Sequence, residues 1–483
     1  MILDCFHVPE EIRDQLEYRS LTFEGKTGKI ELRVPDLTAA QLEEITRILK
    51  KQYQDYVRHL RVQDVIDVLD QAVQRWLDPS YERRQIAQEC LPIITGYDGE
   101  MIRLFLTQYL RNFRKEKLQR IVDEDFTNPL VLDEFRPRMA GGLVRAYGPE
   151  LATHIFSGNV PGLPLWSLAS GLLVKSATLG KVSSSEPLFP VLFVKTIEEI
   201  NPKLARAIAI VWWKGGHQEL EETAFGHSEL VIAYGSERST REIARRIPSH
   251  VRFIPHGHKV SFGVIARECL EVSLASITAR LAARDASWFD QQGCLSPHVF
   301  FVEKGGKISP RDFSRLLAQE MAAFEHKMPR AALSTEEQQA LIQARSQAEF
   351  QSFQDEGTEC LASREDSSWT VIYREKADFS LSPLNRFVSV IPIQDLEEGI
   401  KKVTALKAYL QTVGIACPPL KFRKWIELLG QCGVNRICAL GEMPQPKSGW
   451  HHDGRLNLGD LVRWCDIESS AEEQMDRYDP NRD

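Results

Sequence analysis

From about residue 143 onward, short apolar runs alternate with amphipathic stretches, and this alternation restricts the possible folds more than any other feature of the chain. A strand, a helix and a further strand joined by short loops predict a parallel sheet with helices on both faces. Such a sheet binds its ligands at the carboxyl ends of the strands. We expect strands at 153–156, 177–181, 207–213, 230–234 and 252–255, and helices that begin at Leu165, Glu186, His217 and Ser239.

More than one domain is expected from a chain of 483 residues. Thr38 and Gln41 have the spacing of a capping box and predict the start of an amphipathic helix. The polar stretch 345–366 is expected to be a surface excursion, whereas a strand and then a helix opened by Asp395 continue the α/β pattern. We predict a mainly helical region at 1–140 that packs on the cofactor domain. This region includes a strand at 29–34 and a helical stretch at 99–122. A cofactor-binding domain at 141–263, a catalytic α/β domain at 264–440 and a C-terminal segment at 441–483 that returns to the cofactor domain are predicted to follow.

Composition excludes several classes of protein. The formal net charge of −7 offers no basic field for nucleic acid. The nine cysteines include no Cys-x-x-Cys pair, so neither a zinc site nor a disulfide framework is expected, and we predict no metal. No secretory signal opens the chain, and no apolar run approaches the ~18 residues of a membrane span. We expect a cytoplasmic protein, because a reducing compartment keeps a thiol free.

Cys294 is the candidate nucleophile. It follows Gly293 at a turn that precedes the apolar run 299–302, and the glycine lets the backbone bend sharply. The sulfur can then face a cleft, and the backbone N–H of Cys294 can donate to an oxyanion. The alternative is that Cys294 is a small buried apolar residue.

Asn159 lies between a predicted strand and a predicted helix. Its side-chain amide can donate to a developing oxyanion together with the N–H of Cys294. The alternative is an Asx-turn, in which the side chain bonds its own backbone.

Three strand ends predict a nucleotide site. The Gly180-Lys181 pair resembles part of a phosphate-binding loop, but the first glycine of that motif would fall on Lys175. Ser184 follows Lys181 by three positions, where an acidic residue would favour an unphosphorylated ribose, so there is room for the 2′-phosphate of NADPH. The alternative is a serine-rich helix cap. The predicted cofactor-binding residues are Lys181, Ser183, Ser184, Lys214, Gly215, Gly235 and Ser236.

His256 and His258 follow a predicted strand and are candidates to activate the thiol or to protonate an alkoxide. His298 is expected in a strand on the same face as Cys294. The alternative for each is a hydrogen-bonded structural histidine. The pair His451 and His452 could line the cleft or lie on a turn, and the sequence leaves both open.

In this order, the motifs resemble the acyl-CoA reductases of the bacterial luminescence operons, the LuxC-type fatty-acid reductases of the aldehyde dehydrogenase superfamily. The resemblance extends from about residue 142 to 467. It rests on the blocks Gly158-Asn159-Val160-Pro161, Leu165-Trp166-Ser167-Leu168, Gly180-Lys181-Val182-Ser183-Ser184, Val211-Trp212-Trp213-Lys214-Gly215-Gly216, Cys294-Leu295-Ser296-Pro297-His298 and His451-His452-Asp453-Gly454-Arg455.

The resemblance implies an α/β fold of the aldehyde dehydrogenase type. It implies that Cys294 is the nucleophile, that Asn159 binds the oxyanion, that Lys181 holds the adenosine ribose and that Gly235 and Ser236 form the phosphate turn. The sequence departs from the superfamily in two places. No acidic residue occupies 254–259, where the hydrolytic enzymes carry a water-activating glutamate, and Phe379 stands where a glutamate contacts the nicotinamide ribose.

The activity that the resemblance implies is NADPH-dependent reduction of a long-chain acyl thioester, acyl-CoA or acyl-protein, to the fatty aldehyde through a Cys294 acyl-enzyme. A homo-oligomer and an acyl-protein synthetase partner are implied as well. Two alternatives stay open. One is an aldehyde dehydrogenase in the oxidative, CoA-acylating direction, and the other is a non-reducing acyl carrier or transferase subunit.

Overall fold

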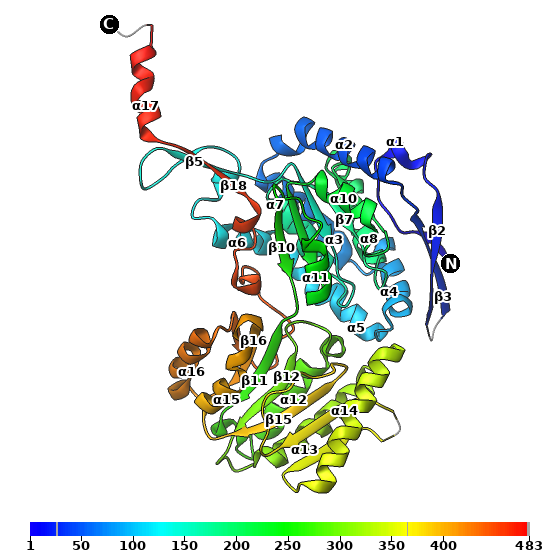
Figure 1. Ribbon diagram of the computed structural model, residues 1–483, viewed down its shortest axis with the longest axis vertical. Helices are drawn as coiled ribbons and strands as arrows, with labels where there is room; N and C mark the ends of the chain where they lie inside the picture. Colours follow the sequence, from blue (N-terminus) through cyan, green and yellow to red (C-terminus); the bar gives the residue numbers. More distant parts are fainter. Residues whose placement is uncertain (26–27, 365, 481–483) are drawn as a thin grey trace.

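Two lobes, each built on a largely parallel sheet, follow one another along the long axis of the molecule (Figure 1). The computed structural model describes residues 1–25, 28–364 and 366–480. The upper lobe in Figure 1 holds the N-terminal region and a five-stranded sheet, and the lower lobe holds a seven-stranded sheet. The chain crosses between the lobes at β10 and β11 and returns after β17, so side chains from distant parts of the sequence meet between them.

The five-stranded sheet is wholly parallel, with the strand order β10-β9-β6-β7-β8. Its inner strands are buried along their whole length, as expected for a parallel sheet covered on both faces. The strands lie within three residues of the predicted bounds, and helices begin within two residues of the predicted starts. The elements are β6 (Leu151–Ile155), α7 (Leu163–Leu173), β7 (Ala177–Lys181), α8 (Leu188–Ile200), β8 (Ile208–Val211), α10 (Gln218–Gly226), β9 (Leu230–Tyr234), α11 (Glu237–Ala244) and β10 (Arg252–His256).

The N-terminal region combines helices with a small sheet. The predicted strand is part of a hairpin, β2 (Tyr18–Gly25) and β3 (Gly28–Pro35), with β1 (Ile2–Asp4) beside β3. His7 exchanges two backbone hydrogen bonds with Ile210 of β8, which attaches this region to the five-stranded sheet. The capping box of Thr38 and Gln41 is confirmed. The helices are α2 (Ala39–Asp55), α3 (Val62–Leu77) and α4 (Glu82–Thr95).

The region predicted to be helical at 99–122 is helical, but it is not one continuous α-helix. The structure has α5 (Gly99–Leu104), a π-helical turn at Phe105–Tyr109, a 3-10 turn at Leu110–Phe113 and α6 (Lys115–Asp125). The break coincides with packing against Gly162: the ring of Phe105 lies where a side chain at that glycine would be, and the Tyr109 hydroxyl donates to the Gly162 carbonyl. Tertiary packing therefore overrides the helical periodicity of this stretch.

The seven-stranded sheet has the order β13-β14-β15-β12-β11-β16-β17 and is parallel except for β13. Asp395 caps α15 as predicted, since its carboxylate accepts the N–H of Glu398. The described residues of the stretch 345–366 lie mostly at the surface, as expected, and they form the end of α14 and the edge strand β13. The elements are β11 (Val260–Ile265), α12 (Ala275–Ser287), β12 (Pro297–Glu303), α13 (Pro310–Lys327), α14 (Thr335–Gln354), β13 (Thr358–Ala362), β14 (Thr370–Arg374), β15 (Phe387–Ile393), α15 (Leu396–Val403), β16 (Leu410–Ala416), α16 (Pro419–Cys432) and β17 (Arg436–Ala439).

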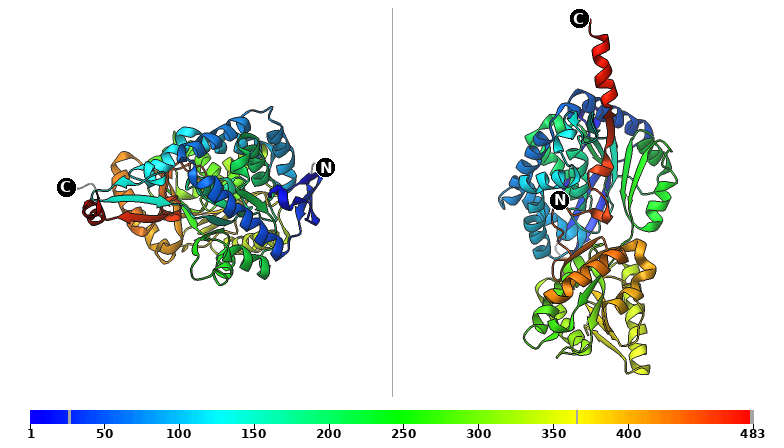
Figure 2. Two further views of the ribbon diagram at one scale, coloured as in Figure 1. Left: turned by 90° about the horizontal axis from the view of Figure 1, so that it is seen from above. Right: turned by 90° about the vertical axis from the view of Figure 1, so that its left-hand side faces the viewer.

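The C-terminal segment runs back from the lower lobe along the upper one (Figure 2). Arg252 of β10 donates to the backbone carbonyls of Asp460, Leu461 and Val462, and so fixes this segment to the five-stranded sheet. Its strand β18 (Arg463–Ile467) pairs with β5 (Leu143–Tyr147), which pairs with β4 (Arg136–Pro137), and α17 (Ser469–Met475) then projects away from both lobes.

The domain boundaries at residues 140, 263 and 440 stay predictions. Within the described ranges, no helix is both long and apolar enough to span a bilayer.

Candidate active site

The carboxyl edge of the five-stranded sheet collects the predicted cofactor residues. Strand order changes direction between β6 and β9, because β7 and β8 lie on one side of β6 and β9 and β10 on the other. Ligands bind α/β sheets at such a switch point. Asn159 follows β6, and Gly235 and Ser236 follow β9 directly beside it. Ser236 also caps α11 by accepting the N–H of Ser239, so the first turn of that helix faces the edge.

Lys181 ends β7 with a side chain that is almost fully buried, and no acceptor bonds its ammonium among the described residues. Desolvation lowers the pKa of Lys181, and the negative charge of Glu221 opposes this shift. A buried cation without a partner fits a site that a ribose or phosphate oxygen completes. Ser183 bonds Ser185 at 2.9 Å in the turn that follows.

Ser184 accepts a hydrogen bond of 2.9 Å from the indole of Trp212, which follows β8. Its hydroxyl therefore links the turns after β7 and β8, and no carboxylate occupies this position. Lys214 and Gly215 come next and are exposed. A ligand can approach this backbone closely, because open space lies where a side chain at Gly215 would project.

Cys294 is partly buried in the turn that enters β12. Its backbone N–H bonds no acceptor from another residue among the described residues, and its carbonyl accepts the Ser261 hydroxyl at 2.8 Å. Desolvation is the main cause that raises the pKa of Cys294 to about 12, and the charge of Asp453 adds to it. The resting thiol is therefore protonated, and a nucleophilic role requires a base.

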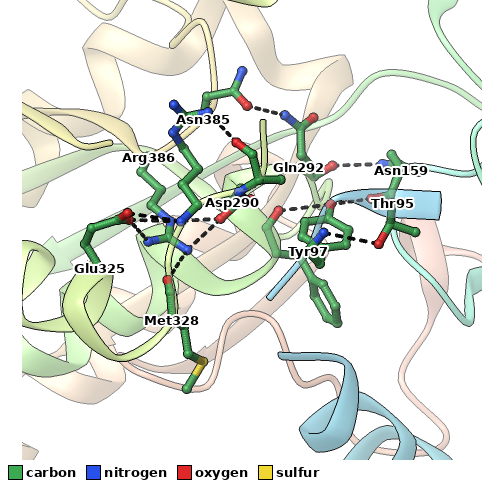
Figure 3. A network of polar contacts seen from close by, with 12 residues as sticks. Thr95, Tyr97, Asn159, Asp290, Gln292, Glu325, Met328, Asn385 and Arg386 are labelled. Atoms are coloured by element: carbon green, nitrogen blue, oxygen red, sulfur yellow. Dashed lines mark hydrogen bonds and ion pairs between the residues drawn. The ribbon is translucent and has the colours of Figure 1, made fainter. Parts of the chain in front are cut away.

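Asn159 belongs to a group of residues that fixes the turn before Cys294 (Figure 3). Its exposed amide donates to the Gln292 carbonyl at 2.8 Å, and its own carbonyl accepts the Tyr97 hydroxyl at 2.6 Å. These bonds do not form an Asx-turn, and they bring Asn159 to the Cys294 turn as the oxyanion hypothesis requires. The Gln292 amide in turn donates to Asn385 at 2.9 Å. We call Asn159, Asp290, Gln292, Glu325, Asn385 and Arg386 the anchored cluster.

Arg386 is the centre of the anchored cluster, and sequence reasoning missed it. Its fully buried guanidinium pairs with Asp290 at 2.7 Å, pairs with Glu325 and donates to the Met328 carbonyl. Positive φ angles occur in two runs of three residues, Phe289–Gln291 and Leu384–Arg386, and none of these residues is glycine. Such backbone is costly and persists only where the surroundings hold it. The buried ion pairs lock the two left-handed runs Phe289–Gln291 and Leu384–Arg386 against each other.

His256 ends β10 and bonds a carboxylate that the sequence does not place near it. Nδ1 of His256 lies 2.7 Å from Oδ2 of Asp453, 197 positions later in the chain. The imidazole stacks on Tyr234, at 4.5 Å between ring centroids, and on His452, at 4.6 Å, and these two rings are themselves 6.1 Å apart. We call Tyr234, His256, His452 and Asp453 the imidazole cluster. The tail motif noted as His451-His452-Asp453 was the only sequence signal for this carboxylate.

The other predicted histidines lie apart from this cluster. His258 is exposed, and its ring meets His298 at 6.2 Å. The expectation that His298 shares a strand face with Cys294 was wrong, because β12 begins at Pro297 and Cys294 lies in the preceding turn. Nδ1 of His298 accepts the N–H of Ser382, and burial lowers the pKa of His298 to about 4, as for a structural histidine. His452 is buried and His451 exposed, so only His452 faces the site.

His256, His452 and Asp453 place ligand-type atoms within 4.8 Å of one another. The two imidazole planes are nearly parallel, at 8°. The lone pair of an imidazole nitrogen lies in its ring plane, so two stacked rings cannot both point at one ion. This geometry does not suit a metal centre.

A pocket borders the imidazole cluster between α7 and the C-terminal segment. His256 and His452 line it together with the polar residues Ser167, Ser170, Arg455, Asn457 and Asp460 and with apolar side chains, and the apolar part of the lining suits methylene groups. The apolar lining includes Trp166, Ile232, Ile254, Leu456 and Leu461.

Comparison with known proteins gives one family and one fold. The family described as acyl-CoA reductase (LuxC) matches residues 57–464, so the match begins well before the predicted residue 142. The long-chain acyl-protein thioester reductase of Aliivibrio fischeri is 26% identical over 420 residues, which cover 85% of this chain and 83% of that protein. The Vibrio harveyi protein of the same name is 24% identical and covers 86% of this chain and 84% of its own length.

Solved structures similar to this chain include aldehyde dehydrogenases. The aldehyde dehydrogenase KauB from Pseudomonas aeruginosa superposes with a TM-score of 0.73 at 13% identity, over 95% of this chain and 98% of that one. The glyceraldehyde-3-phosphate dehydrogenase GapN from Methanocaldococcus jannaschii, complexed with NADP, gives a TM-score of 0.71 at 14% identity, over 93% of this chain and 98% of that one. The predicted aldehyde-dehydrogenase-like fold is confirmed.

Proposed function

This chain belongs to the acyl-CoA reductase (LuxC) family, and from that premise we propose that it reduces a long-chain fatty acyl thioester to the aldehyde through an acyl-enzyme on Cys294. The observation that carries the proposal is the position of a partly buried thiol at the turn that Asn159 contacts, beside the carboxyl edge of the five-stranded sheet. The thioester donor is acyl-CoA or an acylated protein, the latter as named for the relatives.

In the proposed reaction the Cys294 sulfur attacks the thioester carbonyl, and the amide of Asn159 and the N–H of Cys294 hold the oxyanion. The donor thiol departs and leaves the acyl group on Cys294. NADPH, when bound, supplies the hydride that reduces this acyl group. Departure of the Cys294 thiolate from the thiohemiacetal then releases the aldehyde, and the thiolate recovers its proton. His256 is the proposed proton carrier, and the apolar side of the pocket beside it is the proposed start of the acyl-chain site.

The Asp453 carboxylate near Cys294 does not favour hydrolysis of the acyl-enzyme. A water-activating base needs a free, accessible oxygen, but Asp453 is nearly buried and accepts hydrogen bonds from His256 and Gln411 on its two oxygens. The acyl group is therefore kept for reduction.

NADPH is proposed over NADH because Ser184 leaves the ribose site without a carboxylate, and Lys181, Ser183, Lys214, Gly215, Gly235 and Ser236 complete the proposed site. Ser184→Glu should lower the rate with NADPH relative to NADH. A cytoplasmic location, an acyl-protein synthetase partner and a homo-oligomer are also proposed. The homo-oligomer is supported by the small sheet β18-β5-β4, whose edge strands β18 and β4 could pair with another copy of the chain. Sedimentation velocity measures the state of assembly.

The test mixes purified protein with tetradecanoyl-CoA and NADPH and follows cofactor absorbance, with the product identified by mass spectrometry. Loss of NADPH with matching aldehyde is the expected result. Release of CoA without loss of NADPH would instead favour the acyl carrier or transferase subunit. Formation of acyl-CoA from aldehyde, CoA and NADP, without the reverse reaction, would favour the oxidative enzyme.

A further inference from the structure

The sequence at the end of β10 contains no acidic residue, but the hydrogen bond between His256 and Asp453 brings a carboxylate there. Both side chains are shielded, with exposed fractions of 13% for His256 and 6% for Asp453. Asp453 cannot turn away from the imidazole, because its other oxygen accepts the Gln411 amide at 2.8 Å and its backbone is fixed in the left-handed region at φ 56°. The C-terminal segment thus delivers one rigid acceptor to one nitrogen of His256.

The ring of His256 is held as firmly as its partner. Stacking on Tyr234 and on His452, with interplanar angles of 15° and 8°, fixes the plane of the imidazole. Burial opposes ionisation of Asp453, but the hydrogen bond from His256 and the nearby cationic groups lower its pKa to about 2. An ionised carboxylate only accepts, so Nδ1 of His256 carries the proton, and Nε2 is the basic nitrogen. Among the described residues, Nε2 has no hydrogen-bond partner.

We infer that Nε2 of His256 is the base for Cys294 and that Asp453 is a positioning residue that acts through His256. Cys294 interacts electrostatically with Tyr234 and with Asp453, and both of these contact His256, so the sulfur and the imidazole cluster border the same site. The inference rests on the proposed function for the reaction that it serves. The proton of the Cys294 sulfur passes to Nε2, which leaves a thiolate and an imidazolium whose charge the Asp453 carboxylate balances. The imidazolium then returns this proton to the departing donor thiol, so His256 ends neutral and Cys294 acylated.

The same geometry distinguishes the two candidate histidines. His258 is exposed and meets the ring of His298, but no carboxylate bonds it among the residues that the structure describes. Its tautomer and its ring plane are therefore free. Asp453 assigns the role to His256 and leaves His258 without one.

Several charged groups face this pair and contribute to its pH dependence. Lys259 and His452 lie 4.0 Å and 3.7 Å from the Asp453 carboxylate. Tyr234 also stacks on His256. The charges of Asp453, Lys259 and Arg436 act on Cys294. Asp453 bonds the imidazole and not the sulfur, so it favours the imidazolium more than it disfavours the thiolate.

The test compares Asp453→Asn with Asp466→Asn, a change of the same kind at an exposed position of the same segment. Asparagine tolerates the left-handed backbone, so the variant should fold. The rate of iodoacetamide alkylation at Cys294, read by peptide mass spectrometry across pH, reports thiol activation without any acyl donor. Asp453→Asn should alkylate and acylate about 100-fold more slowly at neutral pH, which is within the range of general acid–base catalysis. The acid limb of its profile should move to lower pH, since an amide no longer stabilises the imidazolium.

Two results would overturn the inference and show that Asp453 has only a structural role. One is alkylation of Cys294 in Asp453→Asn at the wild-type rate, and the other is a loss of thermal stability while the acid limb of the pH profile stays unchanged. His256→Ala should be as slow as the double variant with Asp453→Asn, and added imidazole should restore part of its rate. His258→Ala should behave as the wild type. If the wild type shows this base-dependent alkylation but never consumes NADPH with acyl-CoA, the proposed function fails and the positioning role stands.

Discussion

In the proposed reaction, the anchored cluster and the imidazole cluster both act on the Cys294 sulfur, but by different means. The anchored cluster holds backbone: buried ion pairs of Arg386 with Asp290 and Glu325 fix a left-handed turn, and the turn presents the Gln292 carbonyl to Asn159. The imidazole cluster holds a proton site, built from titratable groups on β9, β10 and the C-terminal segment. The residues that fix the backbone and the residues that can exchange a proton thus lie in separate parts of the structure.

This separation makes a general prediction. Changes in the anchored cluster should reduce stability or oxyanion binding without altering the shape of pH profiles. Changes in the imidazole cluster should alter pH dependence with smaller effects on folding. The difference follows from chemistry, because an arginine stays charged at all relevant pH values, whereas the pKa of His452, lowered to about 4 by burial, lies within the pH range of the measurements.

The largest effect is expected when the Cys294 sulfur, on which both clusters are proposed to act, is removed. Cys294→Ala should abolish acyl-enzyme formation and aldehyde production, while NADPH binding and the unfolding transition stay intact. Mass spectrometry of the intact protein after exposure to tetradecanoyl-CoA measures the acyl adduct. Cys465→Ala is the control, because this half-buried cysteine belongs to β18, away from the sheet edges that form the site. An adduct that persists in Cys294→Ala would contradict the assignment of the nucleophile.

Arg386→Met should cause the next largest change, in stability. Removing one partner of a buried ion pair costs about 3–5 kcal/mol, because Asp290 would keep a buried charge and Glu325 a partly buried one without their cation. Denaturant unfolding measures the loss. Arg315→Met is the matched control, since Arg315 is half exposed in its ion pairs on α13. Equal losses in the two variants would show that the anchored cluster does not hold the turn.

Asn159→Ala should lower the acylation rate about 10²- to 10³-fold, as for loss of one oxyanion donor. The pH profile should keep its shape, because an amide does not titrate. Rapid-quench measurement of CoA release across pH tests both statements. Asn112→Ala is the control, since the Asn112 side chain makes no hydrogen bond with other described residues. A shift of the acid limb of the pH profile in Asn159→Ala would show that the two clusters act as one functional unit.

The sequence could predict those features that depend on neighbouring residues. Strands β7 and β9 agree with the predicted bounds, because continuous apolar runs between turn residues are typical of buried parallel strands. Cys294 and Asn159 were identified because glycines and strand ends stand next to them. The elements broken by long-range packing, such as the π-helical turn beside Gly162, were not predictable from periodicity.

The rest of the site depends on contacts across long stretches of chain. Arg386 meets Asp290 across 96 positions, and His256 meets Asp453 across 197. The left-handed backbone at Phe289 has no sequence signal, because aromatic residues rarely adopt it. Asp453 was visible only within a family block, and nothing local connects it to β10. Ion pairs and strained turns of this kind require the fold before their partners can be named.

The smallest effect concerns stability against pH in the imidazole cluster. Burial, with the charge of His256, lowers the pKa of His452 to about 4. Because the unfolded chain binds the proton more readily, this stabilising contribution is complete above about pH 6.5 and declines as the pH falls toward 4, by on the order of 3 kcal/mol. His452→Gln should flatten the fall in unfolding free energy over that window, whereas the exposed His59→Gln should leave it unchanged. Denaturant unfolding at a series of pH values measures the slopes. Arg386→Met should shift the whole curve downward without changing its slope, and a change of slope in that variant would show that the two clusters are electrostatically coupled.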